Sequence, residues 1–377
     1  MRAIINSNGV CRIALLKRLI QFLVLLSATA AQALTFNITY DASVTGSTNS
    51  TQIQAAFGAA TQIIQNLYTN SSTVNITVYW GPSGPFVGGV GLGVSSTSFF
   101  GPFAYSTLTN ALRSQSNTSS DSSALASLPA SDPIAANAWR IPRAEIKALG
   151  LASSIGTTAN DTTQDGAIGF ATNVNYTFDP TNRAVAGKYD FISVALHEIS
   201  EVMGRVYFDL STRYVPYDLF RFTNNGARCF DPNATNVYFS VDNGATSLRA
   251  FYTNQSLGDI QDWKSSGALD SFDAFISSGK KGALSYADLL SLDVIGYKLS
   301  YLPPQLSGTK SIGSSYTLTF TNTPGTTYTV LATTNLALAS TNWITLGTCT
   351  DSVPGNFQFT DTQAGTNKLR FYQLRLN

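Results

Sequence analysis

Histidine and glutamate are almost missing from this chain of 377 residues. It contains one histidine, His197, and its glutamates are Glu145, Glu198 and Glu201. A metal site with two or more histidine ligands is therefore excluded. Two of the glutamates lie within four residues of the histidine, so the residue types that carry most acid–base and metal chemistry are concentrated in one short stretch.

Long apolar runs are also missing after residue 33. Residues 1–33 themselves have the features of a secretory signal peptide. Arg12, Lys17 and Arg18 precede an apolar run at 19–26, and residues 31–33 (Ala-Gln-Ala) fit a small-residue cleavage site. The run is short for a membrane span, so we expect cleavage and no span in the mature chain. An uncleaved N-terminal anchor is the alternative. The expected location is secreted or at the cell surface.

The chain has no excess of positive charge. Removal of residues 1–33 takes away Arg2, Arg12, Lys17 and Arg18 and no acid, so the formal charge changes from +1 to −3. Nucleic acid and anionic membranes are therefore not expected partners. Cysteine is scarce too, and only Cys229 and Cys349 remain after cleavage. They form either one disulfide or two free thiols, and the fold must rest on its apolar core.

Residues 190–205 predict a helix with an apolar face. Ile192, Leu196, Ile199 and Met203 recur at steps of three and four. Asp190 suits the N-cap and Gly204 suits the C-terminal end.

The polar residues of this helix have the spacing of the H-E-x-x-H metal motif, with a glutamate in place of the second histidine. His197 and Glu201 project from one face, one turn apart, and Glu198 is rotated from them by about 100°. We expect His197 and Glu201 to bind a divalent metal. Glu198 is then the general base, which accepts a proton from a metal-bound water that attacks a peptide carbonyl. A surface helix with solvated carboxylates is the structural alternative.

The third ligand is less defined by the sequence. Asp218 is the first choice because its segment follows the helix at a distance that a returning loop can span, and Asp209 and Tyr207 are alternatives. A turn residue is the other reading of Asp218. Zinc is the expected metal, although an oxygen-rich ligand set also suits Mn²⁺ or Ca²⁺, and an added negative ligand makes bound water ionise less readily.

Three further aspartates, Asp242, Asp259 and Asp262, lie in turn-rich segments. Oxygen ligands of this kind suit a structural calcium site. Ordinary turn and loop aspartates are the alternative.

Strand and helix patterns predict an α+β domain at 34–300, a linker at 301–303 and a small β-sandwich module at 304–377. The domain begins with an expected strand at 34–40, a helix at 51–68 and a strand at 74–80. By analogy with the fold of zinc proteases, a strand at 165–172 is expected to border the substrate cleft. The module shows five short alternating strands and contains no histidine or glutamate, so binding, spacing or surface attachment is its expected role.

His-Glu-Ile-Ser-Glu-Val-Met-Gly-Arg at 197–205 resembles the signature of a group of exported bacterial metalloproteases related to the zincins. Segments at 217–222, 238–244, 258–263 and 288–297 resemble later parts of that group in order, so the resemblance covers residues 35–299. Residues 304–377 resemble a C-terminal β-module of many exported bacterial proteins. The chain departs from the metzincins at Tyr207, where they have histidine or aspartate, and at Met203, which lies in the helix instead of a turn.

The resemblance implies a zincin-like fold and a secreted metal-dependent endopeptidase that acts on proteins or peptides. His197 and Glu201 would be its metal ligands and Glu198 its catalytic acid/base. One alternative is a non-catalytic surface adhesion or carbohydrate-binding protein on a degenerate protease scaffold, with polysaccharide contact through the C-terminal module. Another is an extracellular structural protein with an incidental His/Glu cluster.

Overall fold

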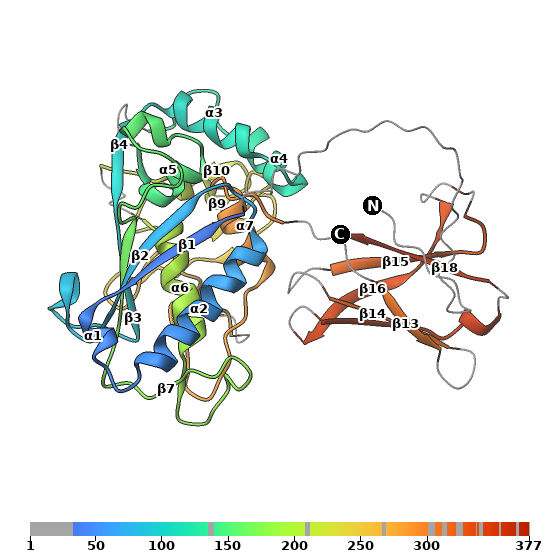
Figure 1. Cartoon of the computed structure of the whole chain (residues 1–377). Helices are drawn as coiled ribbons and strands as arrows, with labels where there is room; N and C mark the ends of the chain where they lie inside the picture. Colours follow the sequence, from blue (N-terminus) through green and yellow to red (C-terminus); the bar gives the residue numbers. More distant parts are fainter. Residues whose placement is uncertain are drawn as a thin grey trace, which may run out of the picture. The chain divides into compact units, whose positions relative to one another are not determined.

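The computed structural model describes residues 33–134, 139–207, 212–265, 269–300, 306–310, 315–321, 327–336, 338, 342–353, 356–366 and 369–376. The chain divides at residues 300 and 301 into two compact units, both visible in Figure 1. Residues 1–32 of the expected signal segment and the expected linker 301–303 lie outside the described residues.

A four-stranded mixed sheet forms the framework of the larger unit. It contains β1 (Thr35–Tyr40), β2 (Thr73–Trp80), β6 (Gly166–Phe170) and β3 (Gly93–Thr97), in the order β1-β2-β6-β3. The first three strands are parallel, and β3 runs antiparallel to β6. The expected strands 34–40 and 74–80 are thereby confirmed. The strand expected at 165–172 is β6, but it is an inner strand, because β3 covers its outer side and forms the edge of the sheet.

Two helices pack on this sheet side by side, as Figure 1 shows, and both were expected from their apolar periodicity. They are α2 (Ser50–Leu67) and α6 (Phe191–Met203). Phe170 of β6 joins them, since its ring centroid lies 6.2 Å from that of Phe57 in α2 and 4.4 Å from that of Phe191 in α6. All three rings are fully buried. Such aromatic contacts add to the burial of apolar area, so the position of α6 is set by the core.

The other helices and strands surround this framework. They include a four-stranded antiparallel sheet with the order β10-β9-β11-β12, the antiparallel pair β4-β5 and the parallel pair β7-β8. The unit is therefore a mixed α+β fold. No helix in the described ranges combines the length and the apolar character that crossing a bilayer requires. The bounds of these elements are α1 (Ala42–Thr45), η1 (Gly84–Phe86), β4 (Phe99–Phe103), α3 (Tyr105–Gln115), α4 (Ser119–Ala126), β5 (Trp139–Pro142), α5 (Arg143–Ala148), η2 (Ala152–Ile155), β7 (Tyr176–Thr177), β8 (Tyr189–Asp190), η3 (Pro216–Phe220), β9 (Arg221–Asn224), β10 (Ala227–Arg228), β11 (Tyr238–Phe239), β12 (Arg249–Ala250) and α7 (Tyr286–Asp293).

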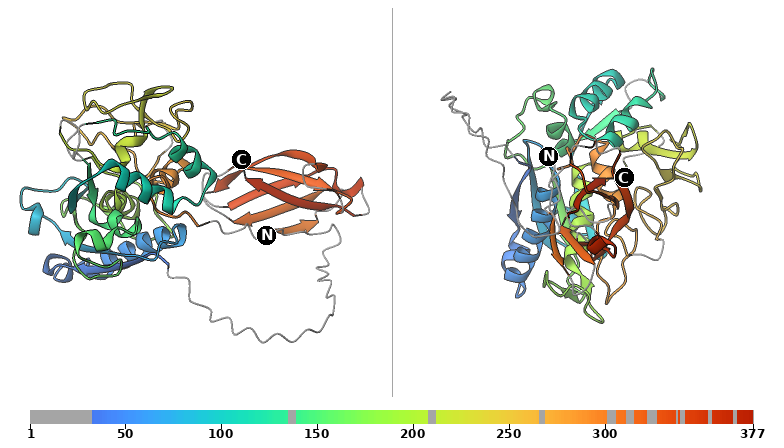
Figure 2. Two further views of the ribbon diagram at one scale, coloured as in Figure 1. Left: turned by 90° about the horizontal axis from the view of Figure 1, so that it is seen from above. Right: turned by 90° about the vertical axis from the view of Figure 1, so that its right-hand side faces the viewer.

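The smaller unit is an antiparallel six-stranded sheet that folds over on itself (Figure 2). The order is β13-β14-β17-β16-β15-β18. Tyr316 of β14 stacks on Tyr372 of β18 at 5.5 Å, and Phe320 of β14 meets Tyr328 of β15 at 5.2 Å. These strands are not neighbours in the sheet, so the rings meet across two layers. The strand bounds are β13 (Ser307–Lys310), β14 (Tyr316–Thr321), β15 (Thr327–Thr333), β16 (Ile344–Val353), β17 (Asn356–Asp361) and β18 (Phe371–Leu376).

Neither described cysteine forms a disulfide. Cys229 and Cys349 are both buried and free, which decides between the two expectations for this pair. Packing and hydrogen bonds therefore hold each unit without a covalent cross-link between these two residues.

A buried acid without a partner lies beneath the end of α6. Glu145 of α5 is fully buried, and neither of its carboxylate oxygens has a hydrogen-bond partner among the described residues. Its Oε2 would lie 2.7 Å from a Cβ placed on Gly204, whose φ of 136° already favours glycine. Burial raises the pKa of Glu145 well above its ordinary value, so the fold favours the neutral acid.

We predict that Glu145→Gln makes the folded protein more stable at pH 8 but not at pH 5. When a carboxyl has a higher pKa in the folded state than in the unfolded state, the free energy of unfolding falls as pH rises from the unfolded-state pKa to the folded-state pKa. This loss amounts to about 1.4 kcal/mol for each pH unit in that window. Urea denaturation at both pH values, with Asp231→Asn at an exposed position as the control, measures the difference. An unchanged pH dependence in Glu145→Gln would contradict it.

Candidate metal centre

Helix α6 begins and ends at the residues that its sequence indicated. The Asp190 carboxylate caps the helix by accepting the Ser193 N–H, and it also accepts from Arg183 Nε at 2.9 Å and from the Gly282 N–H at 3.2 Å. Gly204 ends the helix. The expected cap and stop are thus confirmed. The expected apolar stripe is buried at all of its positions: Ile192, Leu196, Ile199 and Met203.

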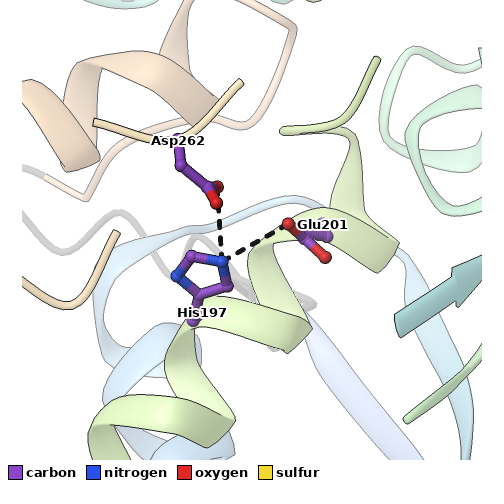
Figure 3. A group of neighbouring side chains, drawn as sticks. All are labelled: His197, Glu201 and Asp262. Atoms are coloured by element: carbon purple, nitrogen blue, oxygen red, sulfur yellow. Dashed lines mark ion pairs between the residues drawn. The ribbon is translucent and has the colours of Figure 1, made fainter. Parts of the chain in front are cut away.

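The single imidazole of the chain is held in one orientation. His197 Nδ1 lies 3.0 Å from the carbonyl oxygen of Ser271. A carbonyl oxygen only accepts, so Nδ1 carries the proton and the lone pair of the neutral ring is on Nε2. This nitrogen lies 3.4 Å from Glu201 Oε1 and 3.3 Å from Asp262 Oδ1, as Figure 3 shows. Metal-binding histidines in proteins are usually oriented in this way by a partner on the other nitrogen.

The group formed by His197, Glu201 and Asp262 fits a metal ion. One ligand atom from each residue lies within 4.8 Å of the other two. Ligands about 2 Å from a tetrahedral ion are roughly 3.3 Å apart, close to the two measured separations from Nε2. Glu201 and Asp262 are buried and His197 is partly so. One nitrogen and two carboxylates form a donor set that could hold a divalent ion such as zinc.

Both carboxylates are oriented by further hydrogen bonds. Glu201 Oε1 accepts from Gln261 Nε2 at 2.9 Å, and Oε2 accepts from Ser95 Oγ at 2.7 Å. Asp262 Oδ1 accepts from Arg205 Nη1 at 2.7 Å. Such outer contacts hold ligands in place before an ion binds.

Close packing of these charges shifts their pKa values. Burial lowers the pKa of His197, but the charge of Asp262 and the hydrogen bonds to Asp262 and Glu201 together outweigh burial and hold the pKa well above its ordinary value. Burial raises the pKa of Glu201, yet the imidazole and Arg205 bring it below its ordinary value. Burial, and then repulsion from Glu201, raise the pKa of Glu198 well above its usual range. The carboxylates therefore favour positive charge at His197 Nε2, where a proton and a metal ion would compete for the same lone pair.

Glu198 lies beside the group in a cavity of about 480 Å³ that His197, Glu201 and Asp262 also line. The edge strand β3 forms one wall of this cavity. A Cβ placed on Gly93 of β3 would lie 2.4 Å from Glu198 Oε1, so only glycine lets the strand approach the carboxylate this closely. Leu257 and Phe275 also line the cavity, and their exposed fractions of 67% and 52% leave large apolar surfaces open to solvent.

Asp218, expected as the third ligand, has a different place. Its Oδ2 accepts the Val215 N–H at 2.9 Å at the start of η3, and burial raises its pKa to about 7. Within the described ranges, the acidic group around His197 contains Asp262 and not Asp218. Of the alternatives, Tyr207 is half-buried just after α6 and Asp209 lies outside the described residues.

The three aspartates considered for calcium do not gather. Asp242 accepts from Ser240 Oγ at 2.7 Å and from the Thr246 N–H at 2.8 Å within its own turn. Asp259 lines the cavity and Asp262 joins His197. The sequence signal for Asp262 was the acidic loop itself, which the spacing alone did not connect to the helix.

Comparisons of the chain with protein-family models, with curated proteins and with solved structures find no match in any of the three. The resemblance of residues 35–299 to exported metalloproteases is thus an expectation, and the functional argument rests on the geometry of the site.

We predict that zinc binding depends on Asp262 and not on Asp218. Asp262→Asn removes a charged ligand and should weaken zinc affinity more than the roughly 10–100-fold that loss of an outer partner produces. Asp218→Asn is the matched control, because it changes a buried aspartate in the same way outside the group. Competition with a chromophoric chelator gives both affinities. A larger loss in Asp218→Asn would show that the ligand is Asp218.

Proposed function

We propose that this protein is a metal-dependent endopeptidase that is exported from the cell and binds its ion with His197, Glu201 and Asp262. The observation that carries the proposal is the convergence of these ligand atoms beside a third carboxylic acid, Glu198, in one open cavity. A structural ion needs only ligands, whereas a hydrolase also needs a base that faces the substrate.

Glu198 has the position of the general base in this proposal. A bound zinc ion would polarise the peptide carbonyl, promote ionisation of a coordinated water and lower the pKa of Glu198 toward the value that a base needs. Glu198 takes a proton from the attacking water and transfers it to the leaving amine. Ser271 keeps His197 in its ligating tautomer, and Ser95 and Gln261 hold Glu201 while the charge on the substrate changes.

The edge strand β3 supports a peptide as the substrate. It pairs with β6 on one side, and it is the last strand of the described sheet on the other. An extended peptide can pair with such an edge through its backbone, which positions a peptide bond without a requirement for one sequence. Residues 93–95 of β3 line the cavity, so a strand added there passes Glu198 and His197.

The described part of the smaller unit holds no corresponding group. Among its described residues, no three histidine, cysteine or acidic side chains come together as metal ligands would. We therefore assign the reaction to the larger unit and a binding or attachment role to the β-module. The alternative function, a non-catalytic binding protein on a degenerate protease scaffold, gives no role to Glu198.

We predict that the zinc-loaded protein cleaves casein or a fluorogenic peptide and that a chelator stops the cleavage. Glu198→Gln should lower kcat/KM by about 10²–10⁴-fold while zinc affinity is retained, because general-base catalysis contributes on that order. Glutamine keeps the shape of the side chain and removes the base. Equal activity in Glu198→Gln would sink the mechanism, and no chelator-sensitive cleavage by the wild-type protein would sink the function.

A second prediction concerns the approach of β3. Gly93→Ala places a methyl group against the Glu198 carboxylate and should lower kcat/KM by about 10²-fold, the usual effect of a 1 Å misplacement. Gly91→Ala is the matched control in the same cavity wall, because its nearest contact would be the Gly93 carbonyl oxygen at 3.8 Å. Similar activity in the two variants would show that β3 does not position Glu198.

A further inference from the structure

Arg205 is a fully buried cation next to the proposed metal centre. It follows Gly204 at the end of α6, and its guanidinium contacts the helix on one side. Nε donates to Ser200 Oγ at 2.8 Å, and Nη2 lies 3.6 Å from Glu201 Oε1. An arginine at this depth is unusual unless its donors are used.

The same guanidinium contacts the loop that carries Asp262. Nη1 donates to Asp262 Oδ1 at 2.7 Å and lies 3.3 Å from the Gln261 carbonyl oxygen. Its Cζ is 4.5 Å from the centroid of the Phe272 ring, which belongs to the segment that orients His197. One side chain thus joins the helix that bears His197 and Glu201 to both segments that complete the site.

The charge on Arg205 matches what the ligand set lacks. A divalent ion with one neutral histidine and two carboxylates has no net charge, whereas the two-histidine, one-glutamate set of many zinc hydrolases leaves one positive charge. The guanidinium of Arg205, which lies next to both carboxylates, supplies one positive charge to the site. The positive potential that favours ionised water is therefore kept in a site with an extra carboxylate.

We infer that Arg205 is the positioning residue of the metal centre: it holds the Asp262 carboxylate at the spacing that an ion requires and offsets the charge of the second acidic ligand. The inference rests on the proposed metal site, but it does not depend on peptide hydrolysis. Arginine suits this role because its planar fork serves acceptors on two segments at once, whereas the single ammonium of lysine cannot span them.

Zinc affinity of the purified protein tests this role without any substrate. Chelator competition at one pH should show affinity about 10–100-fold weaker in Arg205→Gln, as for other outer partners of metal ligands. Arg205→Lys keeps the charge but loses the planar guanidinium, so its zinc affinity should lie between those of the wild-type protein and Arg205→Gln.

A double-mutant cycle separates positioning from general stability. If Arg205 acts through Asp262, Arg205→Gln should change zinc affinity little in an Asp262→Asn background. Arg205→Gln alone leaves Asp262 without its cationic partner and could fail to fold for that reason. The double variant replaces both charged groups with neutral amides, so it buries no unpaired charge from this pair. Circular dichroism and thermal melting identify the folded variants that enter the comparison.

The outcomes are distinct. Equal or tighter zinc binding in folded Arg205→Gln or Arg205→Lys overturns the inference, as do fully additive losses in the cycle or absence of zinc binding by the wild-type protein. A coupled loss of affinity supports it. If that coupling is found in a protein that cleaves no peptide, the role of Arg205 stands and the proposed function fails.

Discussion

The hydrogen bond between His197 Nδ1 and the Ser271 carbonyl is the contact on which the proposed site depends. Since the chain has one histidine, no other imidazole can replace a ring that turns away. The bond fixes which nitrogen is free and where it points. Glu201 and Asp262 then meet Nε2 from the same helix and from a distant loop, and each of them has its own hydrogen-bond partner.

The same helix supplies two of the three proposed ligands, His197 and Glu201, and part of the core. One face of α6 packs its apolar stripe on the sheet, where Phe191 meets Phe170, and the other face lines the cavity. Ligand positions are therefore as rigid as the core packing that holds the helix. The buried acids on the polar face lose hydration, and this is tolerable because Arg205 and the imidazole lie among them.

The parts of the fold predicted from sequence are those that local rules define. Asp190, the apolar stripe and Gly204 define α6 through capping and periodicity. The edge strand β3 was missed because its residues, Gly-Val-Ser-Ser-Thr, lack the alternating apolar pattern of a strand and obtain their conformation from pairing with β6. Identifying Asp262 as the third proposed ligand required tertiary information. Asp218 was closer in sequence, but Arg205 and Gln261 bring the loop of Asp262 to the helix.

The distance in sequence between the ligands gives the proposed ion an additional effect. A bound ion would join His197 and Glu201 of α6 to Asp262 in a distant loop, so chelation would close a long excursion of the chain as a reversible cross-link. Closing such a loop is entropically unfavourable, and an ion that binds only the closed form shifts the balance by mass action. Local opening of the segment that forms one wall of the cavity would then depend on the concentration of free metal. Resistance of that segment to proteolysis would rise when the protein reaches a metal-rich environment.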